Sequence, residues 1–257
     1  MKAVILAGGL GTRLSEETRL IPKPMVEIGG RPILWHIMKY YSTFGIRDFV
    51  ICCGYRSDVI KQYFLQYQDR HSDISVDLRT GAVERYNPTS EDWRVTLIDT
   101  GVDSMTGGRL KRIAPYVGDE TFCMTYGDGL SDVDVGALIA THKASGLKAT
   151  ITAIHQPSRF GVLELNDGKV ERIREKAADD GTWINGGFFV LEPSVFDYID
   201  GDETIWEREP LEGLTADGQL AVYTHSGFWQ SMDTLREKTL LEELWDKGSP
   251  PWKRWER

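Results

Sequence analysis

The chain opens with Ala3-Val4-Ile5-Leu6-Ala7-Gly8-Gly9-Leu10-Gly11-Thr12-Arg13-Leu14, and this stretch decides the fold. The residues before Gly8 are apolar, which is typical of a short strand that is buried on both faces of a sheet. The glycines that follow let the backbone turn tightly, so that successive backbone N–H groups converge on one anion. The stretch therefore predicts a buried strand that ends in a phosphate-binding turn.

Positive charge follows the turn in the sequence. Arg13 lies within it, and Lys23 comes soon after, in Pro22-Lys23-Pro24-Met25. A glycine-rich turn alone is equally expected in an ordinary strand-to-helix connection. Two common phosphate loops are excluded, because Gly-Lys-Ser/Thr is absent from the turn and Leu14 stands where a dinucleotide-binding loop has its third glycine. The turn and the two cations together favour a polyphosphate site of another type.

Composition limits the class of protein. With 257 residues, of which 41% are hydrophobic, the chain fits one large α/β domain with a sizeable core. A net charge of −9 argues against a nucleic-acid-binding surface. No apolar run reaches the about 20 residues that span a bilayer, and the N-terminus has no secretory pattern. The three cysteines form neither a disulfide framework nor a zinc motif, so we expect reduced core thiols and a cytoplasmic protein.

Strands and helices are predicted to alternate along the first part of the chain. Strands are expected at 3–7, 48–53, 121–126 and 149–154, and helices at 32–45, at 57–65, after Gly108, and from an Asp132 N-cap through 138–142. This order indicates a mostly parallel central sheet flanked by helices. Ligands bind at the carboxyl ends of strands in such sheets. Because the Gly8 turn and Gly127-Asp128-Gly129 both follow strands, we expect them to share a cleft.

The later part of the chain predicts smaller elements. Asn166-Asp167-Gly168 lies between two runs of strand character and predicts a hairpin. A strand is expected at 183–191 and an amphipathic closing helix at 235–245. Residues 66–93 are polar and weakly patterned, which is typical of a surface excursion and leaves a subunit contact open as an alternative.

Several residues suit phosphoryl-transfer chemistry, although each also has a plainer explanation. Asp128 follows a strand between two glycines, where a carboxylate either holds Mg²⁺ or forms an Asx turn. Asp233 precedes the closing helix, where it is either a metal ligand or part of an N-cap with Thr234. Thr106-Gly107-Gly108 either presents polar groups to a base and ribose or simply begins a helix. By itself, Glu175-Lys176 favours a solvated ion pair.

The N-terminal motifs together are more specific than these single residues. Gly8-Gly9-Leu10-Gly11-Thr12-Arg13-Leu14 followed by Pro22-Lys23-Pro24-Met25 resembles the signature of the sugar-nucleotide pyrophosphorylases, nucleotidyltransferases that join a nucleoside triphosphate to a sugar 1-phosphate. The resemblance implies one Rossmann-like domain over 1–257, with a nucleotide-binding part (1–130), a small β-rich sugar-phosphate-binding part (131–233) and a C-terminal helix and tail (234–257). It also implies Mg²⁺ as the cofactor and a homo-oligomer, such as a hexamer.

The resemblance implies a role for each matching residue. The implied nucleotide-binding residues are Leu6, Ala7, Gly8, Gly9, Gly11, Thr12, Arg13, Ser104, Thr106, Gly107 and Arg109. The implied sugar-phosphate-binding residues are Lys23, Gly127, Glu175, Lys176 and Asn185. Arg13 and Lys23 are the implied catalytic residues, and Asp128 and Asp233 are the implied metal ligands. In one departure, Ala177 follows Glu175-Lys176 where the family often has proline, which leaves the rigidity of that loop open.

Other stretches resemble one branch of the family, which uses CTP and glucose 1-phosphate. They are Ile51-Cys52-Cys53-Gly54-Tyr55, Ser104-Met105-Thr106-Gly107-Gly108-Arg109, Phe228-Trp229-Gln230 and Pro251-Trp252-Lys253. The resemblance implies that a cytidylyl group is transferred to give CDP-glucose and pyrophosphate, for surface polysaccharides such as O-antigen, with no nucleic-acid or membrane partner. Spacing and charge do not select cytosine. A uridylyl- or thymidylyltransferase and a non-catalytic nucleotide-sugar sensor therefore stay as alternatives.

Overall fold

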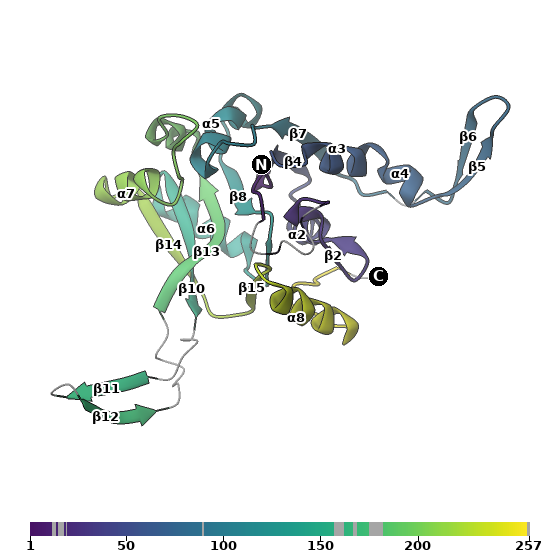
Figure 1. Ribbon diagram of the computed structural model, residues 1–257. Coiled ribbons are helices and arrows are strands. Elements are labelled where there is room, and N and C mark those ends of the chain that lie inside the picture. Colours follow the sequence, from purple (N-terminus) through teal and green to yellow (C-terminus); the bar gives the residue numbers. More distant parts are fainter. Residues whose placement is uncertain are drawn as a thin grey trace.

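The computed structural model in Figure 1 describes residues 1–11, 14, 18, 20–88, 90–156, 162–166, 169–174 and 182–255. For residues 156, 162–166, 169–174 and 182 it describes the backbone alone. Thr12, Arg13, Glu175 and Lys176 lie outside the described residues. The roles expected of these residues therefore stay predictions.

The centre of the molecule is a mixed seven-stranded sheet with the order β14-β10-β13-β8-β1-β4-β7. Its strands are β1 (Lys2–Leu6), β4 (Asp48–Cys53), β7 (Arg94–Asp99), β8 (Phe122–Tyr126), β10 (Ala149–Gln156), β13 (Thr182–Leu191) and β14 (Leu220–His225). Neighbouring strands are parallel, except where β13 pairs with β8 and with β10. The predicted mostly parallel α/β sheet is confirmed.

Helices pack on both faces of the sheet, which explains why its strands are apolar on both sides (Figure 1). One core contains Ala3 and Ile5 together with residues of α2 (Ile33–Ser42), α3 (Ser57–Leu65), α6 (Val135–Ser145) and α8 (Leu235–Asp246). The other contains Val4 and Leu6 with residues of α5 (Thr106–Val117), the 3₁₀ segment η4 (Pro193–Tyr198) and α7 (Glu209–Ala216). Alternate residues of β1 point to opposite faces, so this strand contributes to both cores. No helix in the described ranges is long and apolar enough to cross a membrane.

The three cysteines lie in the two strands that flank β1. Cys52 and Cys53 end β4, Cys123 lies in β8, and all three are buried and free. Burial raises the pKa of each thiol, to about 12 for Cys53 and Cys123. The expectation that the cysteines lie in the core is confirmed.

Short two-stranded units are attached to the main sheet. β2 (Glu27–Ile28) pairs with β3 (Arg31–Pro32), and β9 (Gly129–Ser131) pairs with β15 (Trp229–Ser231). β11 (Val162–Asn166) and β12 (Lys169–Arg174) are antiparallel, as the hairpin prediction requires. The β9–β15 pair joins the middle of the chain to the segment that precedes α8.

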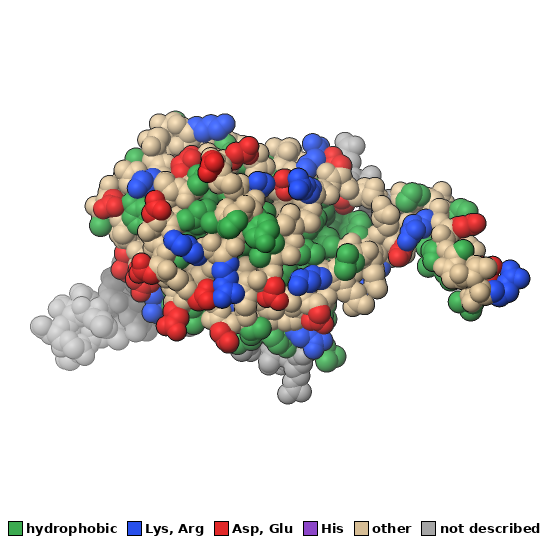
Figure 2. All heavy atoms as spheres, turned by 90° about the horizontal axis from the view of Figure 1, so that it is seen from above, with side chains coloured by type: hydrophobic (Ala, Val, Ile, Leu, Met, Phe, Trp, Pro, Cys, Tyr) green, Lys and Arg blue, Asp and Glu red, His purple; other side chains and the backbone are tan. Residues whose placement is uncertain are grey.

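Residues 67–86, within the polar stretch of the sequence, form an arm that projects from the body of the molecule. The arm consists of α4 (Tyr67–Arg70) and the hairpin of β5 (Asp73–Asp77) and β6 (Ala82–Tyr86), and Figures 1 and 2 show it standing away from the sheet. Nearly every side chain of the hairpin is exposed, and Leu78 near its tip is 91% exposed. The predicted surface excursion is therefore a hairpin with both faces in solvent.

One helix start differs from the prediction. The sequence favours Asp132 as the N-cap of α6, but Asp134 occupies that position, and its Oδ1 accepts from the N–H of Ala137 at 2.9 Å. Asp132 lies instead 2.9 Å from the His225 ring. At α8 the N-cap is Thr234, which forms a capping box with Glu237.

Candidate active site

The glycine turn and the Asp128 loop are neighbours because β1 and β8 are adjacent parallel strands. Leu6 pairs with Tyr126 at their carboxyl ends, and the N–H of Gly127 donates to the Leu6 carbonyl at 2.9 Å. The β9–β15 pair then brings Asp233 to the same place, since the N–H of Met232 donates to the Asp128 carbonyl at 2.8 Å. Residues from the start, middle and end of the chain therefore meet at one edge of the sheet.

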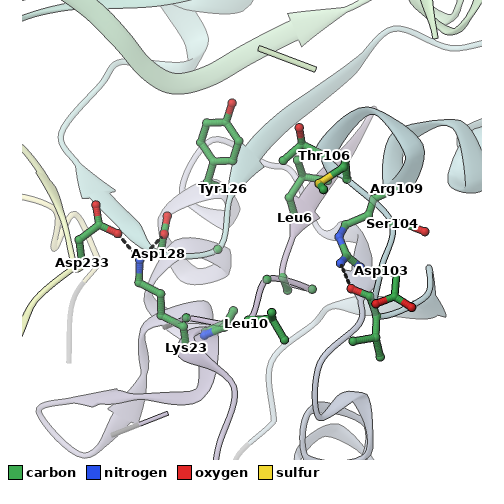
Figure 3. Close-up of a pocket in the computed structure, with 18 residues that line it drawn as sticks. Leu6, Leu10, Lys23, Asp103, Ser104, Thr106, Arg109, Tyr126, Asp128 and Asp233 are labelled. Carbon is green, nitrogen blue, oxygen red and sulfur yellow. Dashed lines mark hydrogen bonds and ion pairs between the residues drawn. The ribbon is translucent and has the colours of Figure 1, made fainter. Parts of the chain in front are cut away.

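These strand ends enclose a cavity of about 680 Å³ (Figure 3). Its lining comes from the glycine turn, from residues 102–106 with Arg109, and from a third group made of Lys23, Pro24, Tyr126, Gly127, Asp128 and Asp233. The volume lies within the range that is typical of small-molecule sites. The shared cleft that the sequence predicts is therefore present.

The glycine turn presents backbone to this cavity. Its lining residues include Leu6, Ala7, Gly8, Gly9 and Gly11. A Cβ on Gly8 would lie 2.1 Å from Arg109 Nη1, and Gly11 has a φ of +63°. Glycine is thus favoured at Gly8 by close approach and at Gly11 by a left-handed backbone. Thr12 and Arg13, which follow Gly11 in the sequence, are outside the described residues.

Lys23 is held between two carboxylates. Its Nζ lies 2.6 Å from Asp128 Oδ2 and 2.6 Å from Asp233 Oδ1 (Figure 3). It begins the 3₁₀ segment η2 (Lys23–Met25), where prolines on both sides restrict the backbone. Burial lowers the pKa of Lys23, but the charges of the two aspartates and the hydrogen bonds to them outweigh burial, so the pKa lies above its ordinary value. Lys23 is therefore a fixed cation at neutral pH.

The two carboxylates are also suitable ligands for a hard metal ion. They already converge on one cation, and Mg²⁺ prefers a few carboxylate oxygens together with substrate phosphate oxygens. Among the residues that the structure describes, no group of three or more His, Cys, Asp or Glu side chains could hold a metal ion. The chemistry of the Asp128 and Asp233 pair thus fits a divalent cation that takes its other ligands from water or a bound phosphate.

Arg109 holds the loop that leads into α5. Its buried guanidinium donates to Thr100 Oγ1 at 2.9 Å, to the Gly101 carbonyl at 2.6 Å and to the Val102 carbonyl at 3.1 Å. Burial lowers the pKa of Arg109. The side chain lines the cavity. Since several of its N–H groups bind the loop, Arg109 shapes the predicted nucleotide side of the cavity as well as contacting it.

Thr106 and Gly107 differ in how they relate to the cavity. Ser104 and Thr106 line it, whereas Gly107 does not and faces Thr204, whose carbonyl oxygen would lie 2.7 Å from a Cβ on Gly107. The Thr106 hydroxyl donates to Glu207 Oε2 at 2.6 Å and accepts from the Trp206 N–H at 2.9 Å. The glycine after Thr106 therefore allows another loop of the protein to approach α5 closely.

Tyr126 and Gly127 line the side of the cavity where the sugar phosphate is predicted to bind, and Tyr126 links Asn185 to it. Gly127 lines the cavity, and a Cβ there would lie 3.0 Å from the Leu6 carbonyl oxygen. Asn185 does not line the cavity itself, but its Nδ2 donates to the Tyr126 hydroxyl at 3.4 Å. Its Oδ1 accepts from the Gly187 N–H at 2.8 Å. Glu175 and Lys176 are outside the described residues, so their place on this side stays a prediction.

Sequence reasoning missed Tyr126 and Glu207. Tyr126 lines the cavity, and its hydroxyl donates to Glu207 Oε1. Burial and the nearby Glu207 carboxylate raise the pKa of Tyr126 far above its ordinary value, so the phenol keeps its proton. The position of Tyr126 directly before Gly127-Asp128 was an available signal. Nothing in the polar run around Glu207 marks that residue.

Comparison with known proteins identifies the family. A sequence model described as nucleotidyl transferase matches residues 2–231. The chain belongs to the nucleotidyl transferase family. Members of this family generally use a divalent metal ion, which agrees with the chemistry of the two aspartates.

Individual relatives extend the match over the whole nucleotidyl transferase chain. It is 60% identical over 257 residues to a glucose-1-phosphate cytidylyltransferase of Salmonella typhimurium, with 100% of both chains covered. It is 48% identical to a probable glucose-1-phosphate cytidylyltransferase of Bacillus subtilis, over 99% of this chain and 100% of the relative. The crystal structure of HddC from Yersinia pseudotuberculosis shares the fold, with a TM-score of 0.70 at 24% identity over 95% of this chain and 99% of that one. The resemblance to the sugar-nucleotide pyrophosphorylases is confirmed.

Proposed function

We propose that this nucleotidyl transferase is a glucose-1-phosphate cytidylyltransferase, which converts CTP and α-D-glucose 1-phosphate into CDP-glucose and pyrophosphate. The observation that carries the proposal is the Lys23 ammonium, which Asp128 and Asp233 hold beside the glycine turn in one cavity. A cradle for phosphates, a cation and metal-binding carboxylates are what phosphoryl-type transfer requires. The full-length relatives at 60% and 48% identity support the choice of CTP and glucose 1-phosphate.

The reaction is an in-line displacement at phosphorus. An oxygen of the sugar phosphate forms a bond to the α-phosphorus of CTP. The bond from that phosphorus to the oxygen bridging to the β-phosphate breaks, and pyrophosphate leaves with the bonding electron pair. The sugar phosphate is already anionic at neutral pH, so the reaction requires no protein base. Catalysis then consists of positioning and charge stabilisation.

Two catalytic cations act on the phosphates in this proposal. Lys23, fixed at the cavity wall, neutralises the α-phosphate and the incoming sugar phosphate. Backbone N–H groups of the glycine turn, from Gly8 to Gly11, bind the triphosphate. Thr12 extends this cradle, and Arg13 offsets the charge that develops on the leaving pyrophosphate.

Mg²⁺ is the proposed cofactor, with Asp128 and Asp233 as its protein ligands. When bound, it screens the charges of the triphosphate and stabilises charge on the phosphoryl oxygens. The chain holds both carboxylates in place for this. The Asp128 carbonyl accepts from Met232, and the Asp233 N–H donates to Glu237 Oε2 at 2.7 Å at the start of α8.

The sugar phosphate occupies the other side of the cavity in this proposal. Gly127 leaves room for the hexose ring, and Asn185, Glu175 and Lys176 bind its hydroxyls and phosphate. We accordingly assign residues 1–130 to nucleotide binding, 131–233 to sugar-phosphate binding, and 234–257 to a closing helix and tail. The positions of Thr106 in the first part and of Asn185 in the second support this division, and Lys23 and Gly127 of the first part also serve the sugar phosphate in this proposal.

The proposal includes a homo-oligomer, such as a hexamer, in the cytoplasm. The projecting arm supports association, because a two-stranded hairpin is at best marginally stable alone in water and this one exposes Leu78 and other apolar side chains. Free, buried cysteines suit a reducing compartment. A monomer in light scattering at micromolar concentration would contradict the oligomer.

A nucleotide competition assay tests the proposed activity. The protein is incubated with Mg²⁺, glucose 1-phosphate and equal concentrations of CTP, UTP and dTTP, and the sugar nucleotides are separated by anion-exchange chromatography. We expect CDP-glucose as the main product, with an equal amount of pyrophosphate. A preference for UTP or dTTP refutes the base assignment. Tight nucleotide binding without pyrophosphate release refutes catalysis and identifies a nucleotide-sugar sensor.

A further inference from the structure

A single carboxylate connects the two sides of the cavity. Glu207 Oε2 accepts from the Thr106 hydroxyl at 2.6 Å, and Glu207 Oε1 accepts from the Tyr126 hydroxyl. Thr106 begins α5 on the proposed nucleotide side, and Tyr126 ends β8 on the proposed sugar side. In Figure 3 both hydroxyl oxygens lie along the same upper edge of the cavity. Glu207 thus contacts one lining residue from each side.

The loop that precedes Glu207 is packed closely against α5. The Met105 N–H donates to the Asp202 carbonyl at 2.8 Å, and the Gly107 N–H donates to the Thr204 carbonyl at 2.9 Å. Trp206, directly before Glu207, is buried, and its backbone N–H donates to Thr106 Oγ1. These contacts fix the backbone from which the Glu207 side chain extends, so its carboxylate has a defined place although it is exposed.

The hydrogen-bond inventory sets the direction of each bond. A carboxylate only accepts, so both hydroxyls must direct their protons to Glu207. The Tyr126 oxygen also receives Asn185 Nδ2 at 3.4 Å. Once its proton is committed to Glu207, the phenol oxygen offers only acceptor capacity to the cavity. A ligand group that contacts it must therefore be a donor, such as a sugar hydroxyl.

We propose that Glu207 is a positioning residue for sugar recognition, which orients the Tyr126 phenol so that it accepts a hydrogen bond from a hydroxyl of the sugar phosphate. This inference rests on the proposed function, because it assumes that a sugar 1-phosphate occupies the side of the cavity next to Tyr126. Glu207 itself does not contact the sugar phosphate in this proposal and acts only by orienting the Tyr126 hydroxyl.

Replacing Glu207 by glutamine separates orientation from packing. Glutamine has the same shape, but its amide has one oxygen in place of two, so it cannot accept from both hydroxyls. Thr106 Oγ1 is held in place by the Trp206 backbone N–H at 2.9 Å, whereas Tyr126 has the cavity beside it as an alternative direction for the phenol proton. We therefore expect the amide oxygen to stay on Thr106 and the amide N–H₂ group to face Tyr126, which reverses the polarity that Tyr126 presents to the sugar.

The test is a double-mutant cycle with Glu207→Gln, Tyr126→Phe and the double variant. Glu203→Gln is the matched control, because Glu203 is exposed in the same loop and makes no hydrogen bond or ion pair within the described residues. Initial-rate kinetics give kcat and KM for each substrate, and calorimetry with an unreactive CTP analogue gives the Kd of glucose 1-phosphate without turnover. Thermal unfolding reports on folding in every variant.

We expect Glu207→Gln to lower kcat/KM for glucose 1-phosphate about tenfold, which corresponds to about 1.4 kcal/mol. The KM of CTP should stay within about twofold and the Tm within about 2 °C of wild type. Because Glu207 acts through Tyr126, the double variant should lose no more than Tyr126→Phe alone. Glu203→Gln should match the wild type.

Several results would overturn the inference. One is that Glu207→Gln keeps the wild-type kinetics for glucose 1-phosphate, or changes the KM of CTP and the KM of glucose 1-phosphate equally. Others are that Tyr126→Phe binds glucose 1-phosphate as the wild type does, or that the losses of the two single variants multiply in the double variant. Failure of the proposed function gives a different result. In that case the wild type and Glu203→Gln would also not convert CTP and glucose 1-phosphate.

Discussion

Replacing Lys23 by methionine keeps the length of the apolar stem and removes the charge between Asp128 and Asp233. The ammonium lies 2.6 Å from an oxygen of each carboxylate, so without metal it neutralises the same two carboxylates that a divalent cation would bind. Two opposite effects are therefore expected from one substitution. Catalysis loses a fixed cation, and metal binding loses a competitor.

The expected gain in metal affinity follows from the distances between Lys23 Nζ and the two carboxylate oxygens. Since each oxygen lies 2.6 Å from Nζ, the two oxygens are at most twice that, about 5.2 Å, apart. Two unit charges at that distance repel by about 1 kcal/mol in water and by about 3 kcal/mol at an effective dielectric constant of 20. The Asp128 and Asp233 side chains are 31% and 24% exposed, so the variant lies between these limits. A divalent cation relieves this repulsion, so its affinity should rise by about 5- to 150-fold.

The assay measures metal binding without nucleotide and activity with it. Titration with Mn²⁺, read as free ion by electron paramagnetic resonance, gives the affinity, and thermal unfolding with and without Mg²⁺ gives the stabilisation. We expect Lys23→Met to have a lower Tm than wild type without metal and a larger rise with it. Loss of a group that stabilises the transition state typically lowers kcat by about 10²–10³-fold, which pyrophosphate release would measure.

Lys39→Met is the matched control. It removes the ion pair between Lys39 and Glu91, which also has an N–O distance of 2.6 Å. Neither of these two residues lines the cavity. Lys39→Met should leave metal affinity and kcat unchanged. The reasoning is refuted if Lys23→Met binds Mn²⁺ no more tightly than Lys39→Met and the wild type, and the catalytic role of Lys23 is refuted if kcat is unchanged.

Burial lowers the pKa of His36 to about 4. As the pH falls, the His36 imidazole therefore takes up a proton in the unfolded chain before it does so in the folded protein. The unfolding free energy should fall by roughly 2–3 kcal/mol between pH 7 and pH 4. Urea titrations should show a smaller loss in His36→Gln, and equal losses would contradict this account. A Cβ on Gly108 would lie 2.4 Å from the Asp202 carbonyl oxygen, so Gly108→Ala should lower the unfolding free energy by about 1–3 kcal/mol. Gly9→Ala, where nothing lies within 4 Å of the added Cβ, should keep the wild-type unfolding free energy, and equal Tm values for the two variants would argue against the packing role of Gly108. Arg109→Met removes hydrogen bonds from the loop before α5, so initial-rate kinetics should show the KM of CTP raised by about tenfold or more and that of glucose 1-phosphate changed less. An equal rise in both KM values would show that the loop does not serve the nucleotide alone.

The central sheet, and the part of the site formed by the glycine turn, Lys23 and Asp128, were predictable because they depend on local sequence. The apolar run before Gly8 predicts β1, and the glycines predict the turn that lines the cavity. Asp128 was placed correctly at the cavity because it follows a strand, and strand ends of a parallel sheet meet at one edge. Lys23 was identified because its positive charge follows the turn closely and because Pro22-Lys23-Pro24-Met25 resembles part of the family signature.

The contacts of the 201–207 loop were not predictable, because they arise from tertiary packing. Glu207 is an exposed glutamate in a polar run, which has the composition of an ordinary surface segment. Gly107 was assigned to nucleotide binding through the resemblance. In the structure, Gly107 and Gly108 accommodate the carbonyls of Thr204 and Asp202. Close approach of a ligand and close approach of another backbone require the same glycine, so sequence alone does not separate the two.

The structure differs from the sequence-based prediction at two further places, the N-cap of α6 and the strands of the arm. Asp132 and Asp134 both precede α6, and only the observed backbone shows that Asp134 has the N-cap position. The strands of the arm were missed because both of their faces are exposed, so they carry no alternation of apolar and polar residues. The pattern that identifies most strands is produced by burial, which this hairpin lacks.

The placement of every native thiol inside the sheet makes the chain convenient for site-directed labelling. Thiolate is the reactive form, and Cys52, Cys53 and Cys123 are inaccessible and protonated at neutral pH, so maleimide dyes and spin labels should leave the folded wild type unmodified. A cysteine introduced on the arm, for example Ser75→Cys, would then carry the probe alone, with no need to replace the native residues. Slow modification of the native thiols would in turn time the transient opening of the β4–β1–β8 layer.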